Sequence, residues 1–170
     1  IVIGSVGRFN VVKNQKFFVE VAKELVKTDP NFIFMLVGRD NTINNNELMG
    51  WLSEHNLINN FRLLGQRDDI PRCLKAMDIF CLHSKTEGFP NVLGEAMALG
   101  VTAIARDVGD SKYLIQNKLL IQNEVDGFCR TIITLLNDRI LLAEEGRRNI
   151  DIVRKFSMDE YINRINRIYS

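Results

Sequence analysis

The feature that most constrains this sequence is a series of short, nearly continuous apolar runs. Residues 31–37 read NFIFMLV, which is the pattern of a parallel strand buried on both faces. Comparable runs occupy residues 1–6, 61–64, 77–82, 101–105 and 119–121. Segments with helical spacing of apolar residues separate most of these runs. The alternation predicts an α/β fold, a doubly wound (Rossmann-like) parallel sheet of about six strands with helices on both faces.

The segments between the runs carry signals for where helices begin. Asn14 is expected to cap the first helix. Residues 44–46 are all asparagine and can cap the second, while the acids and the proline of residues 68–71 should open a short third helix. Beyond Asn123 the chain is expected to be helical to its end.

Composition excludes several classes of protein. The 170 residues are 46% hydrophobic with a formal net charge of +1, which fits one soluble globular domain and not a nucleic-acid-binding protein. No apolar run reaches membrane-spanning length and no signal peptide is visible, so we expect a cytoplasmic protein. The cysteines show no C-x-x-C spacing and the histidines are isolated, so no metal site is expected. Because the chain opens without a methionine, we expect an excised domain or a C-terminal half.

Residues 87–100 form the most informative local stretch. Glu87 and Glu95 stand eight positions apart, with a turn and a helix start between them. Pro90 disfavours helix at the residue before it, and Asn91 is a strong N-cap candidate. The helix should therefore begin at about Val92.

The first turn of this helix is a candidate anion site. The amides of Val92, Leu93 and Gly94 should lack partners within the helix and lie at the positive end of its dipole. Two carboxylates beside such a site make sense if they bind neutral hydroxyls, which points to a sugar nucleotide: a diphosphate flanked by a ribose diol and a hexose. The alternative is that Glu87 is a solvated loop charge and Glu95 a first-turn glutamate favoured by the dipole.

The segments after the expected strands should converge on one crevice, because ligands of such sheets bind outside the carboxyl ends of the strands. These segments are residues 7–8, 38–39, 65–67 and 83–91. Arg8 and Lys13 could complete a diphosphate clamp opposite the helix N-terminus. The alternative is that both are ordinary surface charges. The sequence has neither a G-x-G-x-x-G motif after its first strand nor a G-x-x-x-x-G-K-[ST] loop, so the phosphates must be held differently.

Several short motifs occur together in this chain. They are VGRF at residues 6–9 with Lys13 and Asn14, LVG at 36–38, LG at 64–65 and SKTEGFPNVLGEAMALG at 84–100. Taken jointly, they resemble the donor-binding domain of the group 1 (family 4) retaining glycosyltransferases. The resemblance implies a GT-B fold, in which two Rossmann-like domains face each other across a cleft. Residues 1–170 would form its C-terminal half, the nucleotide-sugar donor-binding domain.

The resemblance also implies roles for individual residues. Arg8 and Lys13 would bind the donor diphosphate and stabilise the leaving nucleotide, and Glu87 would bind the donor sugar; these three form the catalytic set. Glu95 would accept hydrogen bonds from the ribose diol. No metal would be needed, because basic side chains and the helix end replace it. The implied donor-binding residues are Gly7, Gly38, Arg39, Gln66, Arg67, Gly88, Phe89, Pro90, Asn91, Val92, Leu93 and Glu95.

The implied reaction is the transfer of a sugar from a nucleotide-diphosphate sugar to an acceptor, with retention of anomeric configuration. We expect it to serve surface-polysaccharide or glycolipid synthesis, with the donor itself as substrate and no separate cofactor. UDP-, GDP- and ADP-sugars stay open. The alternatives are another GT-B enzyme, such as a sugar-nucleotide epimerase or a phosphorylase, and a non-catalytic sugar-nucleotide-binding module.

The end of the chain bears on its partners. Residues 157–170 are expected to form a terminal helix that crosses to a missing N-terminal acceptor domain, as the resemblance implies. Without that domain the isolated chain should transfer no sugar. The basic pairs at residues 147–148 and 154–155 could touch the inner face of the membrane, but solvated helix faces are the favoured interpretation.

Overall fold

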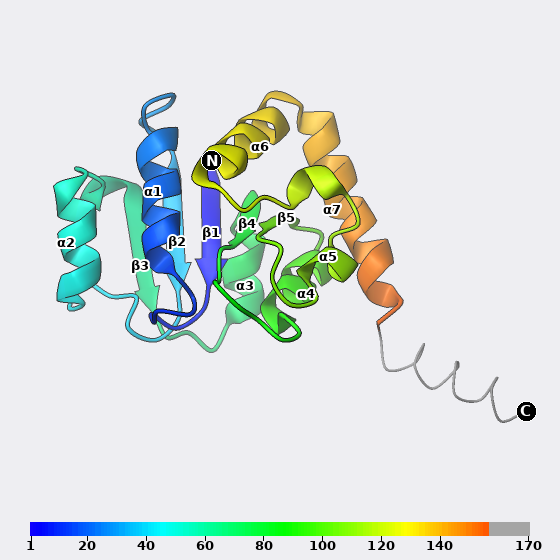
Figure 1. Ribbon diagram of the computed structural model, residues 1–170, viewed down its shortest axis with the longest axis horizontal. Coiled ribbons are helices and arrows are strands. Elements are labelled where there is room, and N and C mark those ends of the chain that lie inside the picture. The colour runs from blue at the N-terminus through cyan, green and yellow to red at the C-terminus, as the bar shows by residue number, and fades with distance from the viewer. Residues whose placement is uncertain (157–170) are drawn as a thin grey trace, which may run out of the picture.

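A five-stranded parallel sheet organises the computed structural model, which describes residues 1–156 (Figure 1). The expected terminal helix at 157–170 lies outside the described residues. The strands are β1 (Val2–Val6), β2 (Ile33–Val37), β3 (Phe61–Gly65), β4 (Ile79–Leu82) and β5 (Thr102–Ala105). The helices are α1 (Gln15–Leu25), α2 (Asn46–Glu54), α3 (Ile70–Lys75), α4 (Asn91–Ala98), α5 (Ser111–Leu114), α6 (Val125–Asn137) and α7 (Arg139–Arg154), with 3₁₀ turns η1 (Ile58–Asn60) and η2 (Lys118–Leu120).

The strand order is β3-β2-β1-β4-β5, which confirms the predicted doubly wound topology. The chain builds outward from β1 to β3 and then returns, so that β4 pairs with β1 on its other side, with Ile3 opposite Ile79. The order therefore reverses between β1 and β4. In sheets of this kind the crevice outside the carboxyl ends at that switch point is the usual ligand site.

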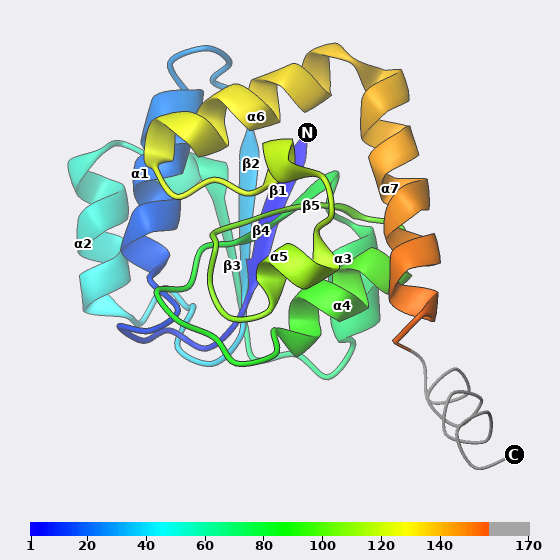
Figure 2. The ribbon, with the colours of Figure 1, turned by 45° about the vertical axis from the view of Figure 1, so that its right-hand side comes forward.

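Helices cover both faces of the sheet, as predicted (Figures 1 and 2). On one face α1 lies between α2 and α6; on the other, α4 packs against α3 and α7, and α7 also contacts the edge strand β5. Phe18 of α1 is fully buried and meets the rings of Phe34 and Phe61 edge-on. Burying such a side chain stabilises the fold by about 1.5–3 kcal/mol, which fixes α1 on the strands. Within the described residues, no helix is long and apolar enough to cross a bilayer.

The strand predicted at residues 119–121 was wrong. Those residues fall mostly in η2, and only Ile121 pairs with the sheet, through an isolated parallel bridge to Ala105. The side chain of Asn117 accepts a hydrogen bond from the amide of Leu119 and so favours a tight turn over an extended strand. Within the part of the chain that the structure describes, the sheet therefore has five strands, not six.

Of the asparagine caps predicted for the first two helices, one is confirmed and one is wrong. Asn45 caps α2, because its side chain accepts a hydrogen bond from the amide of Leu48 at 3.1 Å. Asn14 stands at the N-cap position of α1 but has φ of 58° and makes no capping bond, so that prediction was wrong. Its side chain donates instead to the carbonyl oxygen of His83, at 3.2 Å. A long-range partner has replaced the local one.

The glycines at the carboxyl ends of β1, β2 and β3 converge, as predicted. The amide of Gly7 donates to the carbonyl of Val37 at 2.8 Å, and the amide of Gly38 donates to that of Gly65 at 2.7 Å. The fully buried Asn41 donates to the carbonyl of Gly7 at 2.7 Å and so holds this edge together. Gly38 has φ of +128°, and a Cβ there would collide with the carbonyl group of Gly7.

The core at the carboxyl end of β4 includes a buried histidine. His83 is 2% exposed and its ring stacks on that of Phe18, with centroids 5.0 Å apart. Burial lowers the pKa of His83 to about 4, and the nearby cations Lys13 and Arg106 act in the same direction. The imidazole is therefore neutral at physiological pH.

Replacing Gly38 by alanine should destabilise the fold by ~2–4 kcal/mol, because the substitution combines a left-handed backbone with a steric overlap. The matched control is Gly50→Ala in α2, where an added Cβ meets nothing within 4 Å. That change should stabilise the helix by ~0.5–1 kcal/mol. Urea unfolding of both variants measures the difference, and equal effects would contradict the close approach of the Gly7 and Gly38 backbones.

The stability of the protein should fall as the pH drops from 6.5 towards 4. In that window an unfolded His83 binds a proton that the folded, buried imidazole does not, so protonation favours the unfolded chain. The free energy of unfolding should fall by about 3 kcal/mol relative to His83→Asn, which lacks the titrating ring. Carboxylates titrate alike in both proteins. Urea unfolding at several pH values gives the two curves, and parallel curves would show that His83 is not protected from protonation.

Candidate functional site

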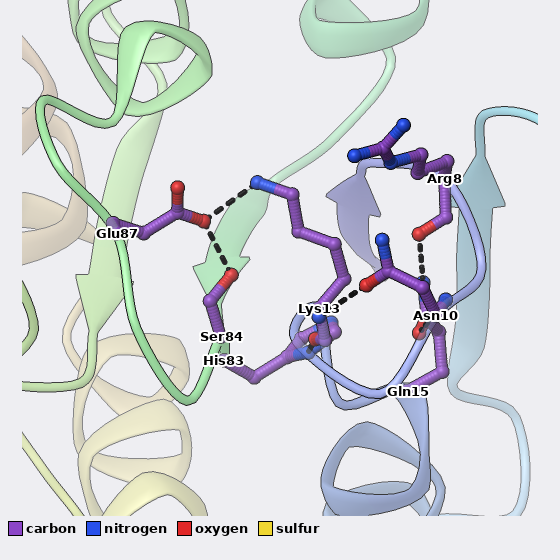
Figure 3. A network of polar contacts seen from close by, with 7 residues as sticks. All are labelled: Arg8, Asn10, Lys13, Gln15, His83, Ser84 and Glu87. Carbon is purple, nitrogen blue, oxygen red and sulfur yellow. Dashed lines mark hydrogen bonds and ion pairs between the residues drawn. The ribbon is translucent and has the colours of Figure 1, made fainter.

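The structure brings Lys13 and Glu87 together at the switch point. The ammonium of Lys13 lies 2.6 Å from Oε1 of Glu87, and the hydroxyl of Ser84 donates to the same oxygen at 2.6 Å (Figure 3). These two charged side chains are only 25% and 13% exposed. They lie 74 positions apart in the chain, so the pair depends on the neighbouring positions of β1 and β4.

Two polar residues that sequence reasoning missed shape the loop before α1. The side chain of Asn10 accepts a hydrogen bond from the amide of Lys13 at 2.7 Å. Gln15, 2% exposed, donates to the carbonyl of Arg8 at 3.0 Å. Asparagine is a common turn residue, because its side chain can bond nearby backbone groups. The buried glutamine carried no such signal, because it reaches back seven positions to the carbonyl of Arg8 and glutamine is not a typical turn residue.

The loop after β4 is joined to the loop after β1. Nδ1 of His83 lies 2.6 Å from the carbonyl oxygen of Lys13, and the side chain of Asn14 donates back to the carbonyl of His83. The amide of Lys85 donates to the carbonyl of Val12 at 2.8 Å. These bonds connect residues 12–14 to residues 83–85 and hold Lys13 beside Glu87.

A third loop, after β5, supports the backbone at Glu87. A Cβ on Gly109 would collide with the carbonyl oxygens of Glu87 and Gly88, so the two segments touch. The amide of Asp110 donates to the carbonyl of Gly88 at 3.1 Å. Gly109 has φ of +50°, which favours glycine at this contact. No role for Gly109 was predicted from the sequence.

The start of α4 differs from its prediction. The helix begins at Asn91 with Pro90 as its N-cap, and Asn91 is therefore not a cap. The carbonyl of Pro90 accepts hydrogen bonds from the amides of Leu93 and Gly94, at 3.0 and 3.3 Å. Of the three amides expected to be open, only that of Val92 has no hydrogen-bond partner within residues 1–156. The anion site at this helix end therefore offers one open amide among the described residues, where three were expected. The positive end of the helix dipole still lies there.

Glu95 and Arg8 are both exposed. Glu95 lies in α4, and its carboxylate makes no hydrogen bond or ion pair to another described residue. Arg8 follows β1, and in Figure 3 its guanidinium extends to the same side as the ammonium of Lys13. Neither side chain makes a hydrogen bond or an ion pair with Glu87. Their predicted roles towards a ribose and a diphosphate stay predictions.

The residues expected to border the nucleotide base follow β2 and β3. Arg39 and Gln66 are exposed. Arg67 is paired with Asp69, with Nε to Oδ1 at 2.8 Å and Nη2 to Oδ2 at 2.7 Å, and the hydrogen bond lowers the pKa of the Asp69 carboxyl below its usual value. Arg67 therefore already has an anionic partner. Among the described residues, no cluster of three or more histidine, cysteine or acidic side chains could hold a metal ion.

This geometry can be compared with known proteins. A family model described as glycosyl transferases group 1 matches residues 1–138. An Escherichia coli UDP-Gal:alpha-D-GlcNAc-diphosphoundecaprenol alpha-1,3-galactosyltransferase is 31% identical over 96% of this chain and 44% of its own length. The phosphatidyl-myo-inositol mannosyltransferase of Mycolicibacterium smegmatis is 27% identical over 92% of this chain and 41% of its own. The chain thus spans less than half the length of these relatives.

Solved structures share the fold. Anabaena Alr3699/HepE in complex with UDP superimposes with a TM-score of 0.86 at 22% identity, over 99% of this chain and 48% of that protein. The C-terminal domain of a group 1 glycosyl transferase (LpcC) from Francisella tularensis gives a TM-score of 0.78 at 22% identity, over 92% of this chain and 86% of that domain. The expected Rossmann-like half of a GT-B fold is thereby confirmed. Together with the family model, which matches well over half of its residues, these comparisons show that the chain belongs to the group 1 glycosyltransferases.

Proposed function

We propose that the chain is the donor-binding domain of a retaining glycosyltransferase that uses a nucleotide-diphosphate sugar. The observation that carries the proposal is the Lys13–Glu87 pair beside the N-terminus of α4 at the switch point. A cation, a carboxylate and the positive end of a helix dipole are groups that could bind a sugar diphosphate, and their proximity supports the proposal. A UDP-sugar is the first candidate donor, because one relative is named for UDP-Gal and Alr3699/HepE was solved with UDP.

In this proposal Arg8 and Lys13 bind the diphosphate. When the bond between the anomeric carbon and the phosphate oxygen breaks, negative charge develops on the departing nucleotide. The two cations and the end of α4 stabilise that charge, which is the kind of fixed electrostatics that usually contributes most to such a step. Glu87 binds hydroxyls of the donor sugar, and Glu95 binds the ribose. The acceptor hydroxyl oxygen bonds to the anomeric carbon on the face that the nucleotide leaves, and the hydroxyl proton passes to the departing diphosphate.

The remaining parts of the reaction lie beyond this domain. We propose that an N-terminal domain of the same protein supplies the acceptor site, so that the chain alone binds nucleotide but transfers no sugar. Relatives named for diphosphoundecaprenol and phosphatidyl-myo-inositol substrates support a role in surface-polysaccharide or glycolipid synthesis. Such acceptors would bring a cytoplasmic protein to the inner face of the membrane, where its exposed Arg147, Arg148, Arg154 and Lys155 could meet anionic lipid.

Removing a proposed donor ligand should weaken nucleotide binding. Isothermal titration with UDP, GDP and ADP should show one preferred nucleotide, and Arg8→Ala and Glu95→Ala should each lower its affinity roughly 10- to 150-fold, the loss of a charge-assisted hydrogen bond (~1.5–3 kcal/mol). The matched control is Lys27→Ala, which removes an exposed cation just beyond the other end of α1 and should change nothing. Unchanged affinity in both site variants would place the nucleotide elsewhere.

Glu87→Gln should raise the affinity for the free nucleoside diphosphate. The carboxylate holds the ammonium of Lys13 at 2.6 Å, so neutralising it frees Lys13 for phosphate oxygens. A partly exposed pair of this kind is worth up to ~1 kcal/mol, which corresponds to a gain of roughly two- to fivefold.

The control for the lost charge is Glu54→Gln, at the end of α2. It should leave the affinity unchanged in the same titration. Equal or weaker nucleotide binding by Glu87→Gln would mean that the diphosphate does not compete with Glu87 for Lys13.

A further inference from the structure

His83 makes its polar contacts to the main chain around Lys13. Its Nδ1 lies 2.6 Å from the carbonyl oxygen of Lys13, and because a carbonyl only accepts, Nδ1 carries the proton. The side chain of Asn14 returns a hydrogen bond to the carbonyl of His83 at 3.2 Å. The two bonds fasten the loop before α1 to the end of β4.

The residue after His83 fixes the other half of the ion pair. Ser84 donates to Oε1 of Glu87, and the same oxygen receives the ammonium of Lys13. The contacts form a closed ring from the Lys13 carbonyl through His83, Ser84 and Glu87 back to the Lys13 ammonium (Figure 3). The position of the ammonium therefore depends on His83 through the main chain of Lys13.

His83 is buried like an apolar core residue, but its Nδ1 makes a hydrogen bond that an apolar side chain could not make. Its ring is 2% exposed and stacks on Phe18, and its Nε2 has no hydrogen-bond partner within the described residues. A leucine could fill much of this space without burying an unpartnered nitrogen, which costs free energy. A leucine has no N–H group, however, and could not hold the carbonyl of Lys13. The Nδ1 contact is what the imidazole adds.

We propose that His83 is a positioning residue for the donor: it holds the main chain of Lys13 so that the ammonium reaches the diphosphate, without touching the donor itself. The inference rests on the proposed role of Lys13. It adds to that role a requirement for one hydrogen-bond donor at residue 83. Any effect of His83 on nucleotide binding then passes through Lys13.

A double-mutant cycle tests this requirement. UDP, GDP and ADP are titrated into the wild type. The nucleotide that binds with the highest affinity is then titrated into His83→Leu, Lys13→Ala and the double variant. His83→Leu should weaken binding roughly three- to tenfold in the wild type and have no further effect once Lys13 is alanine, because coupled residues are not additive. A general structural defect would weaken binding equally in both backgrounds.

Two further variants keep the test decisive. His83→Asn has an amide N–H at about the position of Nδ1, and it should restore most of the affinity that His83→Leu loses. Asn14→Gly removes the returning hydrogen bond while suiting the positive φ at this position, and it should also act only when Lys13 is present. It replaces His83→Leu in the cycle if that variant does not fold.

The outcomes separate the two proposals. If Lys13→Ala weakens binding while the His83 variants bind as the wild type does, the positioning role is wrong and the proposed function stands. Equal losses in both Lys13 backgrounds, or no rescue by asparagine, also overturn the positioning role. If none of the three nucleotides binds the wild type, or if Lys13→Ala has no effect, the proposed donor site fails and the role of His83 fails with it.

Discussion

The parallel pairing of β1 with β4 is the constraint on which the rest of the site depends. Because the strand order reverses there, the loops that follow these two strands leave the sheet side by side. This adjacency is what allows Lys13 and Glu87 to meet across 74 positions of sequence. The hydrogen bonds between residues 12–14 and 83–85 then hold the two loops in fixed positions relative to each other. Moving either strand one place in the order would separate the charges by the width of a strand.

The degree of exposure of the ion pair suits a contact that has to open. A deeply buried pair would lose several kcal/mol if one partner left, because an unpaired charge would remain in the interior. The side chains of Lys13 and Glu87 are 25% and 13% exposed, so water can replace part of each contact. A diphosphate offers more negative charge and more oxygens than one carboxylate. In the proposed function it can therefore take Lys13 from Glu87 at modest cost and leave Glu87 free for sugar hydroxyls.

The strands and the edge of the sheet at which their loops meet could largely be predicted from the sequence, because both follow from local sequence patterns. Buried apolar runs mark parallel strands, and the glycines that end them, Gly7, Gly38 and Gly65, must meet at one edge of such a sheet. One failure came where a long-range partner decided the outcome, and another where a local side-chain bond overrode the apolar pattern. Asparagine is a typical N-cap residue, but the side chain of Asn14 donates to a carbonyl 69 positions away. Leu119 lies in an apolar run, but a side chain two residues earlier turns the backbone.

The residues that position the site were harder to find than those that carry its charge, and the reason is chemical. An ion pair needs a complementary charge, so a lysine and a glutamate in neighbouring loops suggest each other by their charges alone. Gln15 and His83 bond to backbone carbonyls, which every residue has, and a backbone partner leaves no pattern in the sequence. The chemistry of a site can thus be anticipated from residue types, whereas its geometry depends on contacts that only the fold reveals.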